Sequence, residues 1–459
     1  MSRNENLVET SEVENVVENF AETNEANNAG ENLVETNEAG NVAIGGVDSI
    51  ELAKEYGTPL IAYDAGMIRR QIRSFQRIFE ESNVPHRIIY ASKAFSSLAM
   101  YRLASESNIG CDVVSGGELY AALRGGMRPE MIEFHGNNKL PHELEYAVDS
   151  HIGCIVVDNF QEIRLLRRIL NDRDQDMNVM LRVAPGIAAE THEYISTGQE
   201  KSKFGFDIRS GQAAEALQMM MAEPHFNVIG VHCHIGSQIF DVQGFIGAAK
   251  KMAFLLRDWH DEYGFNAQVL NLGGGFGIKY TENDDPLPPE EFVRTIIEVV
   301  NYKVNKFHLQ MPAIWIEPGR ALVGDAATTL YTVGSSKRVD GLCDYVSVDG
   351  GMGDNIRPAL YHAKYEAMLA SNPHAENTQV ATVVGKYCES GDILVKDCPL
   401  PQTHPGDILA IPATGAYGYT MASNYNRNPR PAVVFCENGQ SRLVIRRETY
   451  EDMLRCEVM

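Results

Sequence analysis

One lysine of this sequence is a candidate nucleophile. Lys93 lies within Tyr90–Phe95 (Tyr-Ala-Ser-Lys-Ala-Phe), between a strand-like apolar segment and a helix-like one. A partly desolvated lysine at the end of a buried strand loses its proton more readily and can form a Schiff base with a carbonyl. A solvated loop lysine is common at the same position, so the surrounding elements decide between the two interpretations.

Eight strand-like segments alternate with helix-like ones. Strands are expected at Arg87–Lys93, Ile109–Ser115, Met131–Gly136, Cys154–Asn159, Val179–Pro185, Val228–Gly236, Val269–Gly277 and Ala313–Arg320. Helices are expected at Gly117–Arg124, His142–Asp149, Phe160–Asn171, Gly211–Met221, Gly244–Trp259 and Pro289–Phe307. Most of the strands are continuous apolar runs, as parallel strands covered on both faces require. Eight such units over roughly 250 residues predict a (β/α)8 barrel.

Charged or glycine-rich residues follow every predicted strand. They are Lys93, Asp112, His135 with Asn137, Asp158, Arg182, His234, Gly273 to Gly277 and Glu317 to Arg320. A (β/α)8 barrel carries its active site at this end of the strands. A purely structural barrel does not need such residues at all eight exits, so the pattern predicts an enzyme.

The loops after the seventh and eighth strands have the composition of an anion site. Gly273, Gly274 and Gly275 let backbone N–H groups approach an anion without obstruction by a Cβ atom. Arg320 adds a planar, charged guanidinium, and these two loops form the phosphate site of many barrels. A Schiff-base lysine combined with a phosphate site predicts pyridoxal 5'-phosphate (PLP) as the cofactor. Glu317 is the candidate partner of the pyridine nitrogen, which must stay protonated if the ring is to accept electrons.

Two histidines flank Cys233 in the sixth predicted strand. His234 is suited to stack on the cofactor ring, and the Ser237 hydroxyl is suited to bond its phosphate. Because residues i and i+2 of a strand share one face, zinc bound by His232 and His234 is the alternative. Neither a Cys-x-x-Cys pair nor a third ligand cluster accompanies them, so we expect no metal.

After Arg320 the runs become shorter and are broken by Gly, Pro, Asp and Asn. They are Thr328–Val333, Tyr345–Val348, Gln379–Val384, Ile408–Ile411, Ala432–Cys436 and Leu443–Ile445. Such spacing predicts a second, antiparallel β domain, which Ala43–Tyr63 is expected to join. The predicted division is a β domain of residues 43–66 and 321–459 around a barrel of residues 67–320.

Residues 1–42 form an acidic extension with ten glutamates, one arginine and a net charge of −9. This composition predicts disorder. Valines and a phenylalanine at helical spacing between Val13 and Phe20 leave a partner-docking helix as the alternative.

The whole chain has a formal net charge of −22, which disfavours nonspecific binding to nucleic acid. There is no signal peptide, and no apolar run is long enough to span a membrane. The eight cysteines show no close pairing, which indicates reduced thiols and a cytoplasmic enzyme.

Six motifs, in order, resemble those of the diaminopimelate decarboxylases. They are Tyr90–Phe95, His234–Gln238, Gly273–Gly277, Glu317–Arg320, Cys388–Asp392 and Val444–Asp452. This family is similar to alanine racemase and ornithine decarboxylase in its PLP-binding barrel. The resemblance extends from about Ala43 to the last residue. It implies a homodimer in which the β domain of one subunit completes the active site of the other.

The resemblance also implies residue roles. Lys93 would form the Schiff base, and Cys388 would donate a proton from the other subunit. The implied PLP-binding residues are Lys93, His234, Ser237, Gly273, Gly274, Gly275, Glu317, Gly319, Arg320 and Tyr417. The implied substrate-binding residues are Arg320, Arg357, Tyr361, Glu389 and Tyr417. His192–Gly198 with Ser202–Gly205 resembles a mobile active-site loop, and Lys201 and Gly353 depart from the family pattern.

The expected substrate follows from charge. Diaminopimelate has a carboxylate and an ammonium at its distal end, for which Arg357 with Arg320 and Glu389 are suitable partners. We therefore expect decarboxylation of meso-2,6-diaminopimelate to L-lysine and CO2, the last step of lysine biosynthesis. The alternatives are a related ornithine or arginine decarboxylase, whose substrates lack the distal carboxylate, and a non-catalytic PLP-binding regulator.

Overall fold

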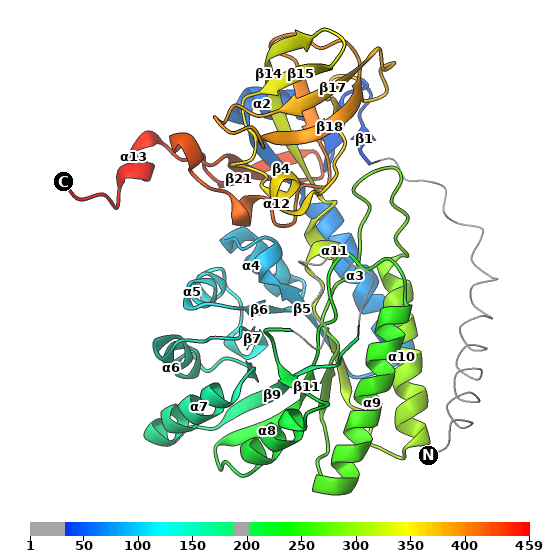
Figure 1. Ribbon diagram of the computed structural model, residues 1–459, viewed down its shortest axis with the longest axis vertical. Helices are drawn as coiled ribbons and strands as arrows, with labels where there is room; N and C mark the ends of the chain where they lie inside the picture. The colour runs from blue at the N-terminus through cyan, green and yellow to red at the C-terminus, as the bar shows by residue number, and fades with distance from the viewer. Residues whose placement is uncertain (1–32, 188–201) are drawn as a thin grey trace.

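The computed structural model describes residues 33–187 and 202–459, which form a barrel and a β-rich domain stacked above it (Figure 1). Most of the predicted acidic extension lies outside the described residues. The same holds for His192–Gly198 and Lys201 of the predicted mobile loop. The chain begins in the β domain, passes through the barrel and returns to the β domain.

All eight predicted barrel strands are present. They are β5 (His86–Ala91), β6 (Gly110–Val113), β7 (Ile132–Phe134), β8 (Cys154–Val157), β9 (Met177–Ala184), β11 (Phe226–His232), β12 (Val269–Asn271) and β13 (Ala313–Ile316). Neighbouring strands pair in parallel, and the pairings of β8 with β9 and of β13 with β5 close the ring. The short strand β10 (Phe206–Asp207) adds to β9. The predicted (β/α)8 barrel is therefore confirmed.

Within the part of the chain that the structure describes, eight helices cover the barrel. They are α3 (Ala65–Ser82), α4 (Leu98–Glu106), α5 (Gly116–Arg124), α6 (Pro141–Asp149), α7 (Phe160–Arg173), α8 (Gln212–Met221), α9 (Gln243–Tyr263) and α10 (Pro289–Lys306). Helix α3, which the sequence analysis did not predict, precedes the first barrel strand and packs against α10. Its buried Ile68, Ile72, Phe75 and Phe79 recur at helical spacing, so the signal was available.

The β domain is built on the strand path β18-β17-β15-β14-β4-β20-β21. Its strands are β4 (Leu60–Asp64), β14 (Ala327–Val339), β15 (Cys343–Val348), β16 (Met368–Leu369), β17 (Gln379–Val384), β18 (Ile393–Leu400), β19 (Ile408–Ile411), β20 (Ala432–Glu437) and β21 (Gln440–Ile445). Most pairs are antiparallel, as predicted. The pairs β15–β17 and β4–β20 are parallel, and each joins strands that are not consecutive in the domain. Strands β16 and β18 were not predicted.

The N-terminal described segment is part of the β domain. Strands β1 (Glu35–Thr36), β2 (Val42–Ile44) and β3 (Val47–Asp48) form a small sheet before helix α2 (Ser49–Tyr56). Val42 is fully buried in an apolar cluster that also contains Leu60 and Val434. The folded part of the chain thus begins before the predicted boundary at residue 42, because the pairing of β1 with β2 extends the sheet.

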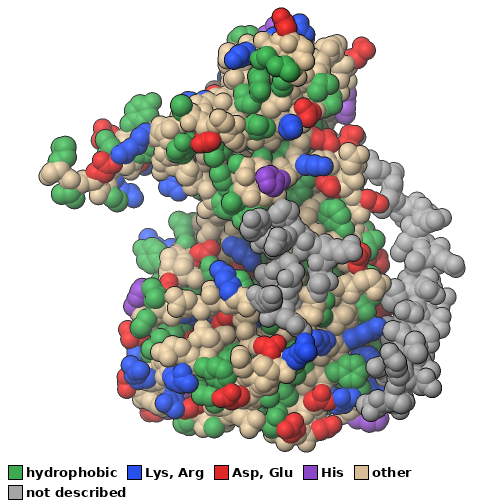
Figure 2. Space-filling view, viewed as in Figure 1, with side chains coloured by type: hydrophobic (Ala, Val, Ile, Leu, Met, Phe, Trp, Pro, Cys, Tyr) green, Lys and Arg blue, Asp and Glu red, His purple; other side chains and the backbone are tan. Residues whose placement is uncertain are grey.

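The C-terminal segment projects from the β domain as an arm (Figure 1). It contains helix α13 (Tyr450–Leu454), and Figure 2 shows green hydrophobic side chains along it. Tyr450, Leu454 and Val458 are all exposed. Within the described ranges, none of the helices combines the length and apolar character that crossing a membrane requires.

Candidate active site

Lys93 lies just beyond the carboxyl end of β5, in the 3-10 turn Ser92–Ala94, and its side chain is exposed. The Ser92 amide donates to Asp112 Oδ1 at 2.8 Å, which ties the turn to the end of β6. The Thr420 hydroxyl of the β domain donates to the carbonyl of Lys93 at 3.1 Å. Lys93 is therefore held at the junction of the barrel and the β domain.

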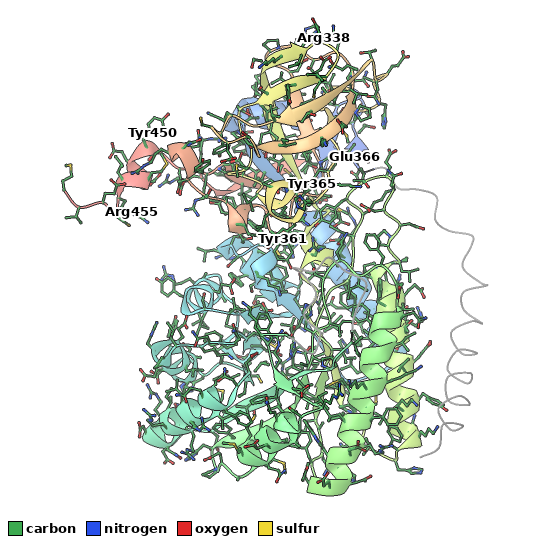
Figure 3. All side chains as sticks on the ribbon, in the orientation of Figure 1. Arg338, Tyr361, Tyr365, Glu366, Tyr450 and Arg455 are labelled. Atoms are coloured by element: carbon green, nitrogen blue, oxygen red, sulfur yellow. The ribbon has the colours of Figure 1, made fainter. Side chains whose placement is uncertain are left out.

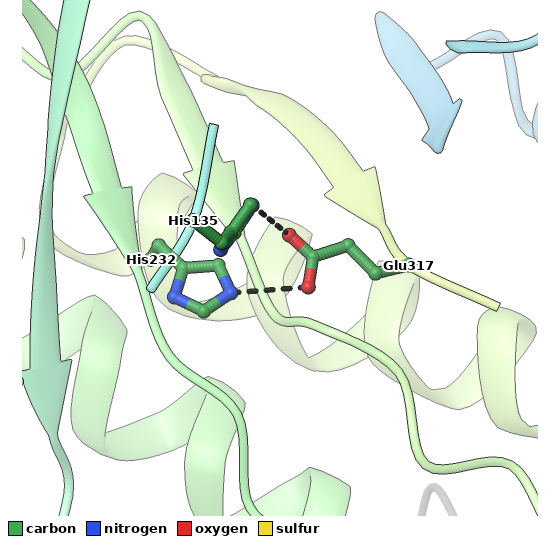
Figure 4. A group of neighbouring side chains, drawn as sticks. All are labelled: His135, His232 and Glu317. Atoms are coloured by element: carbon green, nitrogen blue, oxygen red, sulfur yellow. Dashed lines mark hydrogen bonds and ion pairs between the residues drawn. The ribbon is translucent and has the colours of Figure 1, made fainter. Parts of the chain in front are cut away.

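Glu317 lies at the end of β13 within a buried hydrogen-bond network (Figure 4). Its Oε1 atom lies 3.2 Å from His135 Nε2, and its Oε2 atom lies 3.1 Å from His232 Nε2. The Asn271 amide also donates to Oε1, at 2.8 Å. Three strands other than β13 thus supply donors to one carboxyl group.

The protonation states in this network are unequal. Burial opposes the ionisation of Glu317, but its interactions with His232 and His135, which include a hydrogen bond from each, outweigh burial and hold the pKa of Glu317 well below its usual value. Burial also acts against the charge on His135, yet Glu317 and Glu133 raise the pKa of His135 to about 9. Burial lowers the pKa of His232 to about 4. The arrangement is therefore an ionised Glu317, a cationic His135 and a neutral His232 that donates through Nε2.

The zinc alternative required His232 and His234 to bind the same metal ion, but the two side chains have different hydrogen-bond partners. His232 bonds Glu317, whereas His234 Nδ1 accepts from the Gly274 amide at 3.3 Å. The facing atoms of His135, His232 and Glu317 lie within 4.8 Å of one another, and hydrogen bonds already join them. We therefore interpret this group as an orienting network for the carboxylate.

The glycine-rich loop after β12 adopts a conformation that side chains disfavour. Gly273 has φ of 68° and Gly275 has φ of 112°, both in the left-handed region. A Cβ atom on Gly274 would lie 2.0 Å from the carbonyl oxygen of Glu317, so the two loops approach as closely as backbone allows. A Cβ atom on Gly319 would lie 2.8 Å from the Cβ atom of Ala91.

Ser237 and Arg320 meet beside this loop. Arg320 Nη2 donates to the Ser237 hydroxyl at 2.9 Å, and the buried Arg320 Nε atom has no hydrogen-bond partner among the residues that the structure describes. A buried guanidinium with an unpaired N–H is well suited to an anion. The predicted phosphate residues are therefore brought together in a site that fits the phosphate of PLP.

The charge of Lys93 affects the pKa of the nearby His234. Burial and then the charges of Lys93 and Arg182 lower the pKa of His234 well below its usual value. A neutral imidazole beside the amine is suited to stack on a planar ring, as predicted for His234.

Two guanidinium groups gather around three tyrosines at the domain junction. The buried Arg357 donates to the hydroxyl of Tyr365, and the buried Arg320 donates to that of Tyr280. Arg357 Cζ lies 4.6 Å from the centroid of the Tyr280 ring, and Arg320 Cζ lies 5.0 Å from that of Tyr417. Neither guanidinium forms an ion pair with a carboxylate of the described residues. This charge arrangement can accept an anionic ligand without displacing a protein carboxylate.

Tyr361 ends helix α12 (Arg357–Tyr361), and Figure 3 shows it on the side of the β domain that faces the barrel. Gly353, where the family pattern has serine, lies directly against Tyr387. A Cβ atom on Gly353 would lie 2.1 Å from the Tyr387 hydroxyl oxygen. A side chain at residue 353 would therefore require the Tyr387 ring to move.

Cys388 and Glu389 are exposed on the β domain. The Cys388 amide donates to Asn426 Oδ1 at 2.8 Å. In the described part of the chain, no hydrogen bond or ion pair connects either residue with the barrel.

The sequence analysis did not assign five residues that contact the predicted site. These are His135, His232 and Asn271 around Glu317, and Tyr280 and Tyr365 beside the arginines. His135 was visible as a polar residue at a strand end. Tyr280 and Tyr365 could not be assigned from the sequence in this way, because each lies in a loop after a motif and is not part of the motif.

The barrel with its lysine, carboxylate and phosphate loops defines a pyridoxal-dependent enzyme of the decarboxylase class. Residues 65–324 match the family model of the pyridoxal-dependent decarboxylase, pyridoxal binding domain. The chain is 54% identical over 415 residues to a diaminopimelate decarboxylase of Bacillus subtilis, covering 90% of this chain and 94% of the relative. It is 56% identical over 405 residues to that of Bacillus methanolicus, covering 88% and 94%.

Solved structures agree with these sequence relatives. The crystal structure of diaminopimelate decarboxylase from M. jannaschii in complex with L-lysine superposes with a TM-score of 0.86 at 34% identity, covering 93% of this chain and 98% of that chain. The chain belongs to the diaminopimelate decarboxylase family, as its motifs predict.

Proposed function

We propose that this protein decarboxylates meso-2,6-diaminopimelate to L-lysine and CO2, the last step of lysine biosynthesis. The observation that carries the proposal is the pair of buried guanidinium groups of Arg320 and Arg357, which tyrosine hydroxyls contact and no described carboxylate neutralises. A substrate with a distal carboxylate would pair with this charge. Ornithine would leave the Arg357 guanidinium unpaired, at a cost of about 1–3 kcal/mol or more.

The barrel residues would bind and orient PLP. Gly273 to Gly275, Ser237, Gly319 and Arg320 would hold the phosphate, while His234 would cover one face of the ring. Bound PLP supplies a ring that accepts the electron pair left at Cα when CO2 departs. Glu317, ionised and fixed by three donors, would keep a proton on the ring nitrogen. The Lys93 amine would bind the cofactor aldehyde and later release the product.

The β-domain residues would select the substrate and complete its conversion. Arg357 and Arg320 would bind the distal carboxylate, and Tyr361 and Tyr417 would line the same site. Glu389 is suited to the distal ammonium, and the Cys388 thiol would deliver a proton to Cα.

We further propose a cytoplasmic homodimer with shared sites, because among residues 33–187 and 202–459 no hydrogen bond or ion pair links Cys388 or Glu389 to the barrel. Exposed apolar side chains near the carboxyl ends of β5, β6 and β7 offer a surface for a second copy; they are Leu98, Val114, Tyr120 and Leu140. The exposed hydrophobic residues of the C-terminal arm offer another. All eight cysteines are free thiols, as a reducing compartment allows.

The decisive experiment incubates the purified protein and PLP with meso-diaminopimelate and measures CO2 and L-lysine. Ornithine, arginine and lysine serve as parallel substrates. Stoichiometric release of both products from diaminopimelate alone is expected. Preferred turnover of ornithine or arginine would overturn the substrate assignment, and cofactor binding without any turnover would favour a regulator.

A further inference from the structure

A second buried carboxyl group lies beside Glu317, and the proposed reaction gives it no role. Glu133 is on β7, two residues before His135, and its side chain is 0% exposed. The interior of a (β/α)8 barrel is usually filled with branched apolar side chains. Burying a carboxyl group is costly unless its partners compensate, so a glutamate there indicates a specific role.

Glu133 and Glu317 share two donors. Glu133 Oε2 lies 3.4 Å from His135 Nε2 and 3.3 Å from Asn271 Nδ2. The same two nitrogen atoms lie 3.2 Å and 2.8 Å from Glu317 Oε1. The two carboxyl groups are therefore linked through both His135 and Asn271, and a change in either group alters the donors of the other.

We propose that Glu133 is a positioning residue for Glu317, because it holds His135 and Asn271 against Glu317 Oε1 and balances the charge of His135. A carboxylate has about four acceptor sites. His135, Asn271 and His232 use three of those of Glu317, so one remains on Oε2 for the ring nitrogen of the cofactor. This inference rests on the pyridoxal-dependent function proposed above.

The charge of Glu133 matters because His135 is cationic. When Glu133 is ionised, it offsets His135, and Glu317 keeps its full negative charge for the ring nitrogen. When Glu133 is protonated, His135 neutralises Glu317 instead. Burial raises the pKa of Glu133 to about 7, with His135 acting against this rise. The cofactor environment should therefore change near neutral pH.

Around Glu133, His135 has a pKa of about 9 and His232 a pKa of about 4, so both keep their charge state near pH 7. Asp112, opposite Glu133 on β6, is a second buried carboxyl group whose pKa burial raises. Arg87 on β5 is a permanent cation whose charge lowers the pKa of Glu133. Burial raises the pKa of Cys111 on β6 and of Cys154 on β8 well above the usual value, so both thiols stay neutral. Glu317 is ionised throughout.

The test compares the wild-type protein with Glu133→Gln, which keeps the shape and the acceptor but lacks the charge. Glu130→Gln is the matched control, because Glu130 is exposed just before β7. The PLP dissociation constant and the visible spectrum of the bound cofactor are measured from about pH 6 to pH 8, below the pKa of about 9 of His135. For the wild type we expect tighter binding above pH 7. Glu133→Gln should lack this step and bind about tenfold more weakly at high pH, a loss typical of outer-shell residues.

Each outcome of this test supports or overturns the role of Glu133 or the proposed function. A folded Glu133→Gln that keeps the wild-type pH step overturns the inference, as does a Glu130→Gln that loses it. If Glu133→Gln does not fold, His135→Gln replaces it, since it removes the cation but keeps an amide donor, and the step must again vanish. A wild-type protein that binds no PLP would overturn the proposed function itself. Wild-type binding with an unchanged step in the variants overturns only the role of Glu133.

Discussion

Glu317 in the barrel and Cys388 in the β domain are both assigned to the reaction, but their surroundings differ sharply. Glu317 is buried and accepts hydrogen bonds from three side chains on three other strands. Cys388 is exposed, and its amide donates to Asn426 of the same domain. The described residues of one chain bring the predicted cofactor residues together, but among them no hydrogen bond or ion pair joins Cys388 to the barrel.

This difference indicates which catalytic groups have to be fixed within one chain and which groups a second subunit can supply. A carboxylate that controls a ring nitrogen must be preorganised, because its energetic contribution depends on fixed donors in a dry environment. A proton donor at the edge of the site can be supplied by another subunit, provided that the interface places it reproducibly. Four predictions test this comparison.

The largest effect is expected for Lys93→Ala, which removes the amine from the barrel half. Covalent cofactor absorbance should disappear, and turnover should fall by about 10²–10⁴-fold or more, since the amine also transfers protons. Borohydride reduction of the wild type followed by peptide mapping should label Lys93. Lys251→Ala, at an exposed position of α9, should behave as the wild type. A label on another lysine would contradict the proposed site.

The second prediction tests whether the two halves of one active site come from different subunits. Cys388→Ala and Lys93→Ala should each be nearly inactive alone. After equal mixing with subunit exchange, half of the dimers are mixed and each carries one intact site, so about a quarter of the wild-type activity should return by random pairing. Exchange without recovery, with the two variants carrying different tags, would mean that each chain completes its own site.

A smaller loss is expected for Arg357→Ala, which removes one guanidinium from the junction. The value of kcat/KM for diaminopimelate should fall by about 10²-fold, the equivalent of about 3 kcal/mol for an unpaired carboxylate, while PLP affinity stays near the wild-type value. Arg338→Ala is the control, because Arg338 lies at the far end of the β domain (Figure 3). Equal kcat/KM in Arg357→Ala and the wild type would remove this residue from the substrate site.

The smallest effect concerns stability at the barrel rim. Burial and then the charge of Asp112 raise the pKa of Glu118 to about 7. The folded protein therefore holds a proton that the unfolded chain has released, and folding becomes less favourable as pH rises from the unfolded pKa towards 7. Glu118→Gln, which keeps an acceptor for the Val114 amide, should match the wild type at about pH 4 and melt about 1–3 °C higher at about pH 8. An equal difference at both pH values would exclude this titration.

Much of the barrel was predictable because its strands are buried on both faces and therefore read as continuous apolar runs. The β domain was harder to predict. Strand β18 includes the exposed Lys396 and Asp397, which interrupt the apolar pattern. Strand β4 pairs with two strands that lie hundreds of residues later in the chain, and no local pattern specifies such partners.

The candidate site shows the same limit. Lys93, Gly273 to Gly275 and Arg320 were found because their residue types and their places at strand ends already imply their chemistry. The sequence pattern did not indicate whether His232 or His234 would contact Glu317.

The sequence by itself determined the chemical groups and the strand ends that carry them. Only the tertiary structure decided which groups meet: Asn271 with both Glu133 and Glu317, Arg357 with Tyr280, and Cys388 with Asn426 of the β domain. The physical reason is that hydrogen bonds and charge interactions act over a few ångströms in space. Those distances are set by strand register and by the packing of the two domains, not by separation along the chain.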